Sequence, residues 1–279
     1  MDRVIVVDDA SGDSTREVIR SVGDPRILFF ERGQNGGIAA ARRDAFALSD
    51  ADWTVNLDSD HELLVGAIDG LARLLASAPQ SVDILGARYQ WDTGGVTPVD
   101  IPEGIVGYRE RIILSGQNDN IGADYLCTVS KRLRQLVQWE PLRGSFPDTL
   151  FQLDIAKIGR AVFTSDALAF EKSNGAHSWT RGSAEQRWAR RCKDAHDSVR
   201  ALELILSRHG SALRRWGKPK LAGLFGQGAF FAALSSDRRL AWRWAAKSFS
   251  CGFQYGAWYA PVMIVLPRFV VRQLYLARG

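Results

Sequence analysis

The segment Trp53-Thr-Val-Asn-Leu-Asp-Ser-Asp60 is the strongest single indication of the fold in this sequence. A run of strand-forming residues leads into two aspartates, Asp58 and Asp60, that are one residue apart. A strand that ends in this way places both carboxylates at the carboxyl edge of a sheet, where open α/β sheets bind ligands. Two carboxylates there favour a hard divalent cation, Mg²⁺ or Mn²⁺, which in turn holds a diphosphate. Asp50-Ala-Asp52 has the same pattern, but it lies on the polar turn after a helix.

A second acidic strand end lies near the N-terminus. The apolar run Val4–Val7 predicts a strand buried on both faces, and Asp8 and Asp9 follow it. Ser14-Thr-Arg-Glu17 predicts a helix that opens with a capping box. Asp13 is interpreted as a turn or cap residue. Asp8 and Asp9 could also be turn residues, but adjacent like charges at a strand end are unfavourable without a ligand or a donor.

Between these two strands lies Asn35-Gly-Gly-Ile-Ala-Ala-Ala-Arg-Arg43. Adjacent glycines let the backbone approach a ligand closely, and the helix that follows carries Arg42 in its second turn. A helix N-terminus beside a guanidinium suits a phosphate. A glycine turn before a small-residue helix packed on the sheet explains the same residues, so both interpretations stay open.

Taken in order, the three motifs resemble the family two glycosyltransferases of the GT-A fold. The resemblance spans about Val4 to Leu71, and a looser one continues to about Ser178. It implies an α/β fold with a Rossmann-like mixed sheet flanked by helices, an inverting transfer from a nucleotide-diphosphate sugar, and Mn²⁺ or Mg²⁺ as cofactor. The resemblance assigns base and ribose contacts to Asp8 and Asp9, the lining of the nucleotide-sugar site to Gly37 and Arg42, and ribose and metal binding to Asp58 and Asp60.

The chain also departs from the family pattern. Arg43 and Ala45 stand where the family often has Asn and Gly, and His61 follows the Asp-x-Asp where another Asp is common. The family's first strand, of the type Ser-Val-Ile-Ile-Pro-Thr-Tyr-Asn, would precede Val4 and lie inside the sheet. Two interpretations follow: either the true start lies upstream, or this is a truncated and inactive version.

Asp148 is the candidate general base. In the family, Glu-Asp opens a helix at this point and the Asp is the base; here Pro147 replaces the Glu. An inverting transfer needs a carboxylate within hydrogen-bond reach of the acceptor hydroxyl. The alternative is that Asp148 is a helix N-cap, and the two roles can coexist. A family His aligns with Ser173, and His177 is interpreted as a surface-loop histidine.

Composition bounds the rest. A chain of 279 residues with 46% hydrophobic content holds one α/β domain, predicted at residues 1–178, and a helical C-terminal region at 179–279. The net charge of +5 suits phosphate-bearing substrates and an anionic membrane surface. No nucleic-acid recognition motif supports that partner. Three widely spaced cysteines without metal spacing, and no signal peptide, predict a reducing, cytoplasmic location.

Further elements are expected from the same patterns. Ser81–Tyr89 predicts a strand, Trp91–Gln117 predicts loops with short strands, and Ala184–Arg208 predicts one long amphipathic helix. The charge-free stretch Ser248–Pro267 has basic flanks with Trp and Tyr. It fits an interfacial hairpin at the inner face of the cell membrane, a helical bundle packed on the catalytic domain, or, least well, a membrane span.

Two function classes follow. The leading hypothesis is a metal-dependent glycosyltransferase that acts on a cell-envelope glycan or a lipid-linked acceptor. The alternative is a non-catalytic relative that binds nucleotide or partner chains, which the missing first strand favours. Neither the donor sugar nor the acceptor follows from the motifs.

Overall fold

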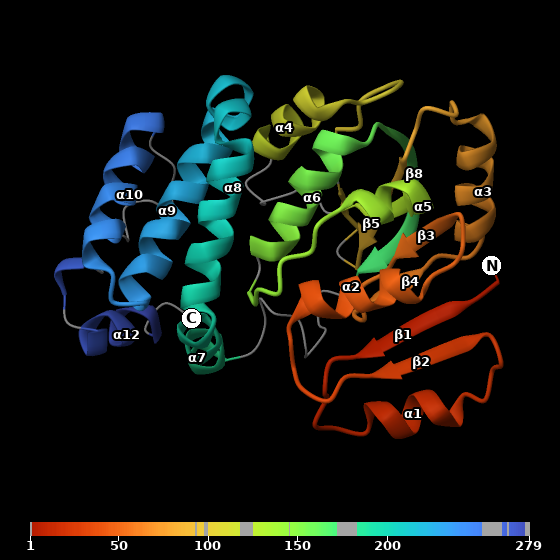
Figure 1. Ribbon diagram of the computed structural model, residues 1–279, viewed down its shortest axis with the longest axis horizontal. Coiled ribbons are helices and arrows are strands. Elements are labelled where there is room, and N and C mark those ends of the chain that lie inside the picture. Colours follow the sequence, from red (N-terminus) through yellow and green to blue (C-terminus); the bar gives the residue numbers. More distant parts are fainter. Residues whose placement is uncertain are drawn as a thin grey trace.

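The computed structural model describes residues 2–92, 94–97, 100–117, 125–144, 146–171, 183–252, 264–266 and 268–276. Strands and flanking helices form one half of the molecule, and the C-terminal helices stand side by side in the other half (Figure 1). The mixed α/β architecture predicted from the sequence is therefore present.

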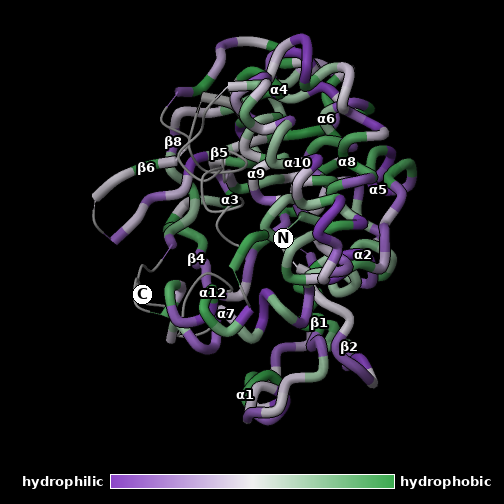
Figure 2. Tube along the Cα trace, turned by 90° about the vertical axis from the view of Figure 1, so that its left-hand side faces the viewer, coloured by the Kyte–Doolittle hydropathy of each residue, from purple (hydrophilic) through white to green (hydrophobic). Residues whose placement is uncertain are grey.

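The N-terminal strands form a small sheet of their own. β1 (Val4–Asp8) and β2 (Ile27–Glu31) pair in parallel, and α1 (Thr15–Ser21) connects them. These elements lie at one end of the molecule (Figures 1 and 2). The predicted capping box of α1 does not form, because the Ser14 side chain makes no cap bond. The N–H of Thr15 instead donates to Asp13 Oδ1 at 3.0 Å, so Asp13 acts as the turn residue that the sequence suggested.

The main sheet holds the remaining strands in the order β3-β7-β5-β8-β4, with β6 paired to β5. Among the described strands of this sheet, β5 and β8 are the one parallel pair, and the other pairs are antiparallel. The strands are β3 (Trp53–Asn56), β4 (His61–Leu63), β5 (Ile84–Trp91), β6 (Val96–Thr97), β7 (Leu126–Ser130) and β8 (Ala161–Glu171).

The two sheets do not join within the described residues: β1 pairs only with β2, and β3 pairs only with β7. The prediction that Val4–Val7 is buried on both faces is wrong, since those four residues are half-buried and only Asp8 of β1 is buried. A strand in a two-stranded ribbon has few neighbours to cover it, which explains the exposure. The interior strand that the family resemblance implies has no counterpart in the described chain.

Helices cover the main sheet and connect its strands (Figure 1). They are α2 (Ile38–Leu48), α3 (Ala67–Ser77), α4 (Tyr108–Gln117), α5 (Lys131–Leu136) and α6 (Phe146–Ile158). The sequence predicted loops where α4 lies. Glycine and proline before Tyr108 suggested that interpretation, but Ile112 is fully buried in the apolar core, and this packing favours the helix.

The C-terminal region is helical, as predicted. Its described helices are α7 (Ala184–Lys193), α8 (Ala195–Trp216), α9 (Lys218–Leu234), α10 (Arg238–Cys251) and α12 (Arg268–Leu276). The prediction of a single helix over Ala184–Arg208 is wrong, because α7 ends at Lys193 and α8 begins at Ala195. The loop before α6 packs there: a Cβ on Gly144 would lie 3.6 Å from Asp194 Cβ and 2.9 Å from Ser198 Oγ.

The C-terminal helices share one apolar core with two helices of the α/β half of the molecule. Phe146 of α6 and Ile112 of α4 belong to the same buried cluster as Leu202 of α8 and Leu221 of α9. Among the described residues, none of the helices has the length and apolarity to cross a membrane. The stretch Ser248–Pro267 lies largely outside the described residues. The domain boundary near residue 178 stays a prediction.

A buried polar chain crosses the same interface. The Tyr108 hydroxyl lies 2.7 Å from His209 Nδ1, and His209 Nε2 lies 2.8 Å from Asp154 Oδ1. Arg208 Nη1 donates to Asp154 Oδ2 at 2.8 Å. His209 is fully buried, so each of its ring nitrogens needs the partner that it has. This chain of contacts fixes α4 and α8 against α6, the helix that carries Asp148.

Candidate active site

Arg42 contacts two carboxylates to which the sequence gives different roles. Asp58 is predicted to bind the donor and a metal, and Asp148 is predicted to activate the acceptor. Its Nη2 donates to Asp58 Oδ1 at 2.6 Å, and its Nη1 donates to Asp148 Oδ1. Asp58 follows β3, Arg42 lies in the second turn of α2, and Asp148 lies in the first turn of α6. Three elements distant in sequence therefore meet at one guanidinium.

The electrostatics of Arg42 follow from this arrangement. Burial alone would lower the pKa of its guanidinium, but the charges of Asp148 and Asp58 outweigh burial and raise that pKa above its ordinary value. The Arg42 side chain is 11% exposed, whereas Asp58 and Asp148 are 36% and 33% exposed. The cation is thus enclosed, and each carboxylate still faces solvent.

Asp148 is not an N-cap by position, since it is the third residue of α6. Only its Oδ1 contacts Arg42. Among the described residues, its Oδ2 has no hydrogen-bond partner. One oxygen is therefore held in place while the other can accept a hydrogen bond from an incoming hydroxyl.

Asp58, Asp60 and His61 form a group that could hold a metal ion. One possible ligand atom from each of the three lies within 4.8 Å of the other two. The group occupies the loop after β3 and the first residue of β4. Asp58 and Asp60 were predicted as metal ligands, whereas His61 was noted only as a departure from the family pattern. Its place directly after the Asp-x-Asp is the signal that would have identified it.

These residues fit a divalent ion by their chemistry. Two carboxylates and an imidazole are ligands that Mn²⁺ accepts, and Asp58 keeps its Oδ2 clear of Arg42. The His61 side chain is 8% exposed, and its Nδ1 is buried without a hydrogen bond. A buried imidazole nitrogen in that state is unusual, and the other ring nitrogen, Nε2, lies 3.9 Å from Asp60 Oδ1.

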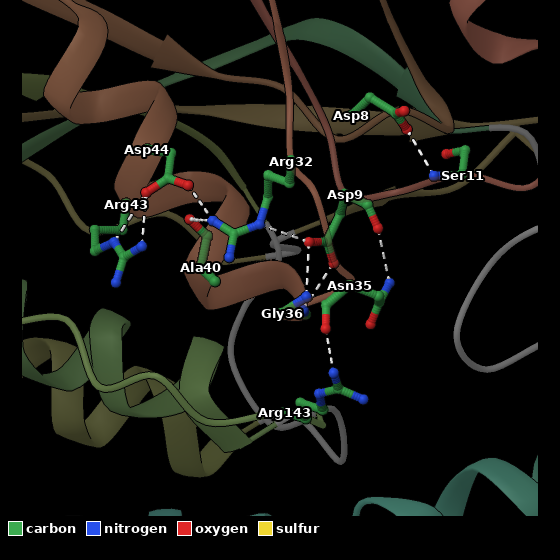
Figure 3. Close-up of polar contacts among 11 residues, drawn as sticks. Asp8, Asp9, Ser11, Arg32, Asn35, Gly36, Ala40, Arg43, Asp44 and Arg143 are labelled. Atoms are coloured by element: carbon green, nitrogen blue, oxygen red, sulfur yellow. Dashed lines mark hydrogen bonds and ion pairs between the residues drawn. The ribbon is translucent and has the colours of Figure 1, made fainter.

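Asp9 ties the end of β1 to the glycine turn before α2 (Figure 3). The N–H groups of Gly36 and Gly37 donate to its two carboxylate oxygens at 2.8 and 2.7 Å. Arg32 Nε forms an ion pair with Asp9 Oδ1 at 2.9 Å, and the Asn35 side chain donates to the Asp9 carbonyl. Both oxygens of Asp9 therefore have protein partners, and its predicted contact with the nucleotide stays a prediction.

Gly37 combines a left-handed backbone with close packing. Its φ is +85°, and a Cβ at this position would lie 3.3 Å from Arg143 Cγ. Arg143 also donates from Nη2 to the Asn35 carbonyl (Figure 3). The close approach that the glycines were expected to offer a ligand is made in part to Arg143, a neighbour that no sequence pattern indicated.

Asp8 is the last residue of β1, and it is buried. Its Oδ1 accepts from the N–H of Ser11 at 3.0 Å, and its Oδ2 accepts from Arg16 Nε at 3.2 Å. Hydrogen bonds from Ser11, followed by those from Arg16, lower the pKa of Asp8 despite its burial. These are the contacts of a turn residue, so a nucleotide contact by Asp8 also stays a prediction. Ser173 and His177 lie outside the described residues.

Sequence and structure comparisons show which known proteins this chain resembles. Residues 2–132 match the family model described as Glycosyl transferase family 2. The succinoglycan biosynthesis protein ExoO of Rhizobium meliloti (strain 1021) is 31% identical over 97 residues, which make up 35% of this chain and 26% of ExoO. The chain thus spans about a quarter of the length of this curated relative.

Two solved structures share the fold. S. aureus TarS 1–349 gives a TM-score of 0.52 at 14% identity, covering 91% of this chain and 83% of that one. Mannosyltransferase PcManGT from Pyrobaculum calidifontis was solved in complex with GDP-Man and Mn²⁺. It gives a TM-score of 0.51 at 17% identity, and the match covers 99% of this chain and 75% of that one. The fold is that of a GT-A protein. Residues 2–132, slightly less than half of the chain, are similar to glycosyl transferase family 2.

Proposed function

We propose that the chain transfers a sugar from a nucleotide-diphosphate sugar to a cell-envelope glycan or a lipid-linked acceptor, with inversion. One observation carries the proposal: Arg42 bridges Asp58 and Asp148. It brings the carboxylate predicted to hold metal and donor next to the carboxylate predicted to activate the acceptor. Because the transfer occurs between these two groups, their juxtaposition is what the reaction needs.

The donor side is formed by the strand ends and by the start of α2. Asp58 and Asp60 would hold Mn²⁺ or Mg²⁺, and a bound ion would stabilise the leaving diphosphate as a Lewis acid. Arg42 would supply a guanidinium to the same diphosphate, since planar N–H donors match phosphate oxygens. Asp8, Asp9 and Gly37 are proposed to line the nucleotide part. The Mn²⁺ and GDP-Man named for PcManGT support this choice of ligands.

Asp148 acts on the acceptor side. Its Oδ2 accepts the proton of the acceptor hydroxyl while Oδ1 stays on Arg42, so the carboxylate does not rotate away. Direct attack by that hydroxyl on the donor sugar inverts the anomeric centre. The role of ExoO in succinoglycan biosynthesis supports a glycan as acceptor. Peripheral contact with the membrane through the C-terminal helices is part of the same proposal.

A second function has one observation in its favour. The β1-β2 sheet is separate from the main sheet within the described residues. A donor site built on both sheets would then lack a rigid frame, which suits a protein that binds nucleotide or a partner chain without turnover.

Turnover separates the two functions. Purified protein is incubated with UDP- and GDP-sugars, Mn²⁺ and candidate glycan acceptors, and release of the nucleoside diphosphate is measured. The enzyme hypothesis predicts release that Asp148→Asn lowers sharply, and a product whose anomeric proton shows inversion by NMR. Binding without release in the full chain would support the second function, and retention would refute the role given to Asp148.

A further inference from the structure

His61 occupies a constrained position beside the two candidate metal carboxylates. It is the first residue of β4, and it pairs with Glu171 across the β4–β8 ladder. Its ring centroid lies 4.4 Å from that of Tyr89, and its side chain is 8% exposed. Packing of this kind fixes the direction in which the ring nitrogens point.

Both nitrogens of this ring lack a hydrogen bond in the described part of the chain. Nδ1 is buried without a partner. Nε2 lies 3.9 Å from Asp60 Oδ1 and 3.7 Å from Glu171 Oε2, and both distances are too long for a hydrogen bond. At least one nitrogen of a buried imidazole normally has a hydrogen-bond partner. The distances from His61 Nε2 to Asp60 and Glu171 therefore need an explanation other than hydrogen bonding.

The distances fit a shared ion. Two ligand atoms that each lie about 2.1 Å from one metal can be at most about 4.2 Å apart. The distances from His61 Nε2 to Asp60 Oδ1 and to Glu171 Oε2 are both shorter than this limit. One ligand atom each from Asp58, Asp60 and His61 lies within 4.8 Å of the others, so shifts of about half an ångström would bring all three onto one ion.

We propose that His61 is a direct metal ligand beside Asp58 and Asp60, that Glu171 adds a further carboxylate, and that His61 makes the site select Mn²⁺ over Mg²⁺. The inference rests on the metal role in the proposed function and adds the ion's identity. Imidazole is a good ligand for transition metals, whereas Mg²⁺ prefers oxygen and keeps its waters. An all-carboxylate site at this position would not discriminate in this way.

The test uses the full chain and metal alone, without nucleotide. Electron spin echo spectroscopy of the Mn²⁺-loaded wild type detects coupling to a ligating ¹⁴N directly, with no substitution required. Calorimetry then gives the Mn²⁺ and Mg²⁺ affinities of the wild type, His61→Asn and His61→Asp. Glu62→Gln, on the opposite face of β4, controls for a nearby carboxylate, and His196→Ala controls for an exposed histidine.

We expect ¹⁴N coupling in the wild type, and Mn²⁺ affinity that is about 10–100-fold lower in His61→Asn. Mg²⁺ affinity should change much less. His61→Asp should bind both ions with a smaller Mn²⁺ preference, and both controls should match the wild type. Circular dichroism checks that each variant is folded.

Two failures have different meanings. Mn²⁺ binding that Asp60→Ala abolishes, but that shows no ¹⁴N coupling and no change in His61→Asn, overturns the inference and leaves the proposed function standing. His61 would then be a packing residue against Tyr89. If the wild type binds no Mn²⁺ at all, the metal role in the proposed function fails as well.

Discussion

Replacing Arg42 by methionine should change two binding constants in opposite directions. The substitution keeps much of the side-chain length and removes the charge. Arg42 then no longer competes for Asp58, so the free protein should bind Mn²⁺ more tightly. The diphosphate also loses its guanidinium, so the donor nucleotide should bind more weakly. A residue with a purely structural role would not produce this pair of changes.

The magnitudes follow from the geometry. Arg42 Nη2 lies 2.6 Å from Asp58 Oδ1, and a metal ligated by that carboxylate would lie about 5 Å from the guanidinium. A unit charge opposes a divalent ion at that distance by about 1–2 kcal/mol in water with physiological salt. Mn²⁺ affinity should therefore rise about five- to thirtyfold. A lost charge-assisted hydrogen bond to the diphosphate is worth about 1.5–3 kcal/mol, so nucleotide affinity should fall about 10–150-fold.

Stability gives a third measurement. The Arg42 side chain is enclosed, whereas Asp58 and Asp148 are each about a third exposed and can be rehydrated. The two ion pairs therefore contribute less to the free energy of unfolding than fully buried ion pairs would. We expect unfolding to become easier by about 1–3 kcal/mol, read from denaturant midpoints. Arg43→Met is the matched control, since Arg43 is more exposed and pairs with Asp44. Unchanged or weaker Mn²⁺ binding in Arg42→Met would refute the competition between the guanidinium and the metal.

Three further predictions concern other parts of the molecule. Asp148→Asn should lower turnover about 10²–10⁴-fold with donor affinity nearly unchanged in calorimetry; a fully active variant would show that the carboxylate is not the base. Burial, followed by the charge of Asp154, raises the pKa of Tyr108 to about 12, so the stability from its neutral form is complete below about pH 10 and lost as pH rises towards 12. Thermal melts across that window should show the loss in wild type, and a Tyr108→Phe protein that showed the same loss would exclude Tyr108 as its source. Finally, the full chain should co-sediment with anionic vesicles at low salt and less at high salt, while a form ending at Ser248 should not; absence of binding by the full chain at low salt would mean that the C-terminal helices only pack on the catalytic half.

Local patterns predicted the parts of the fold that depend on local physics. The apolar run before Asp8, the glycine turn before Arg42 and the strand that leads to Asp58 all lie where the sequence placed them. Each combines hydrophobic periodicity with a recognisable turn or cap, which one segment can encode. The helix over Tyr108–Gln117 was missed because tertiary burial of Ile112 determines it.

The site was predicted as a list of residues, and its connections were not. Arg42 lies 106 residues from Asp148 and 16 residues from Asp58 in the sequence, and no local pattern encodes these two contacts. No local pattern encodes the contacts of Asp9 either, whose carboxylate accepts hydrogen bonds from the N–H groups of the glycine turn. His61 was visible as an unusual residue, but its significance depends on strand pairing with Glu171, which only the structure gives.

Calorimetric titration of UDP and of GDP, each with and without Mn²⁺, tests whether Asp58 and Asp60 hold a metal that in turn holds the donor diphosphate. At least one nucleotide should bind the wild type only when Mn²⁺ is present, and Asp60→Ala should abolish that binding while circular dichroism shows an intact fold. Equal affinity with and without the metal, or undiminished binding by Asp60→Ala, would contradict the account.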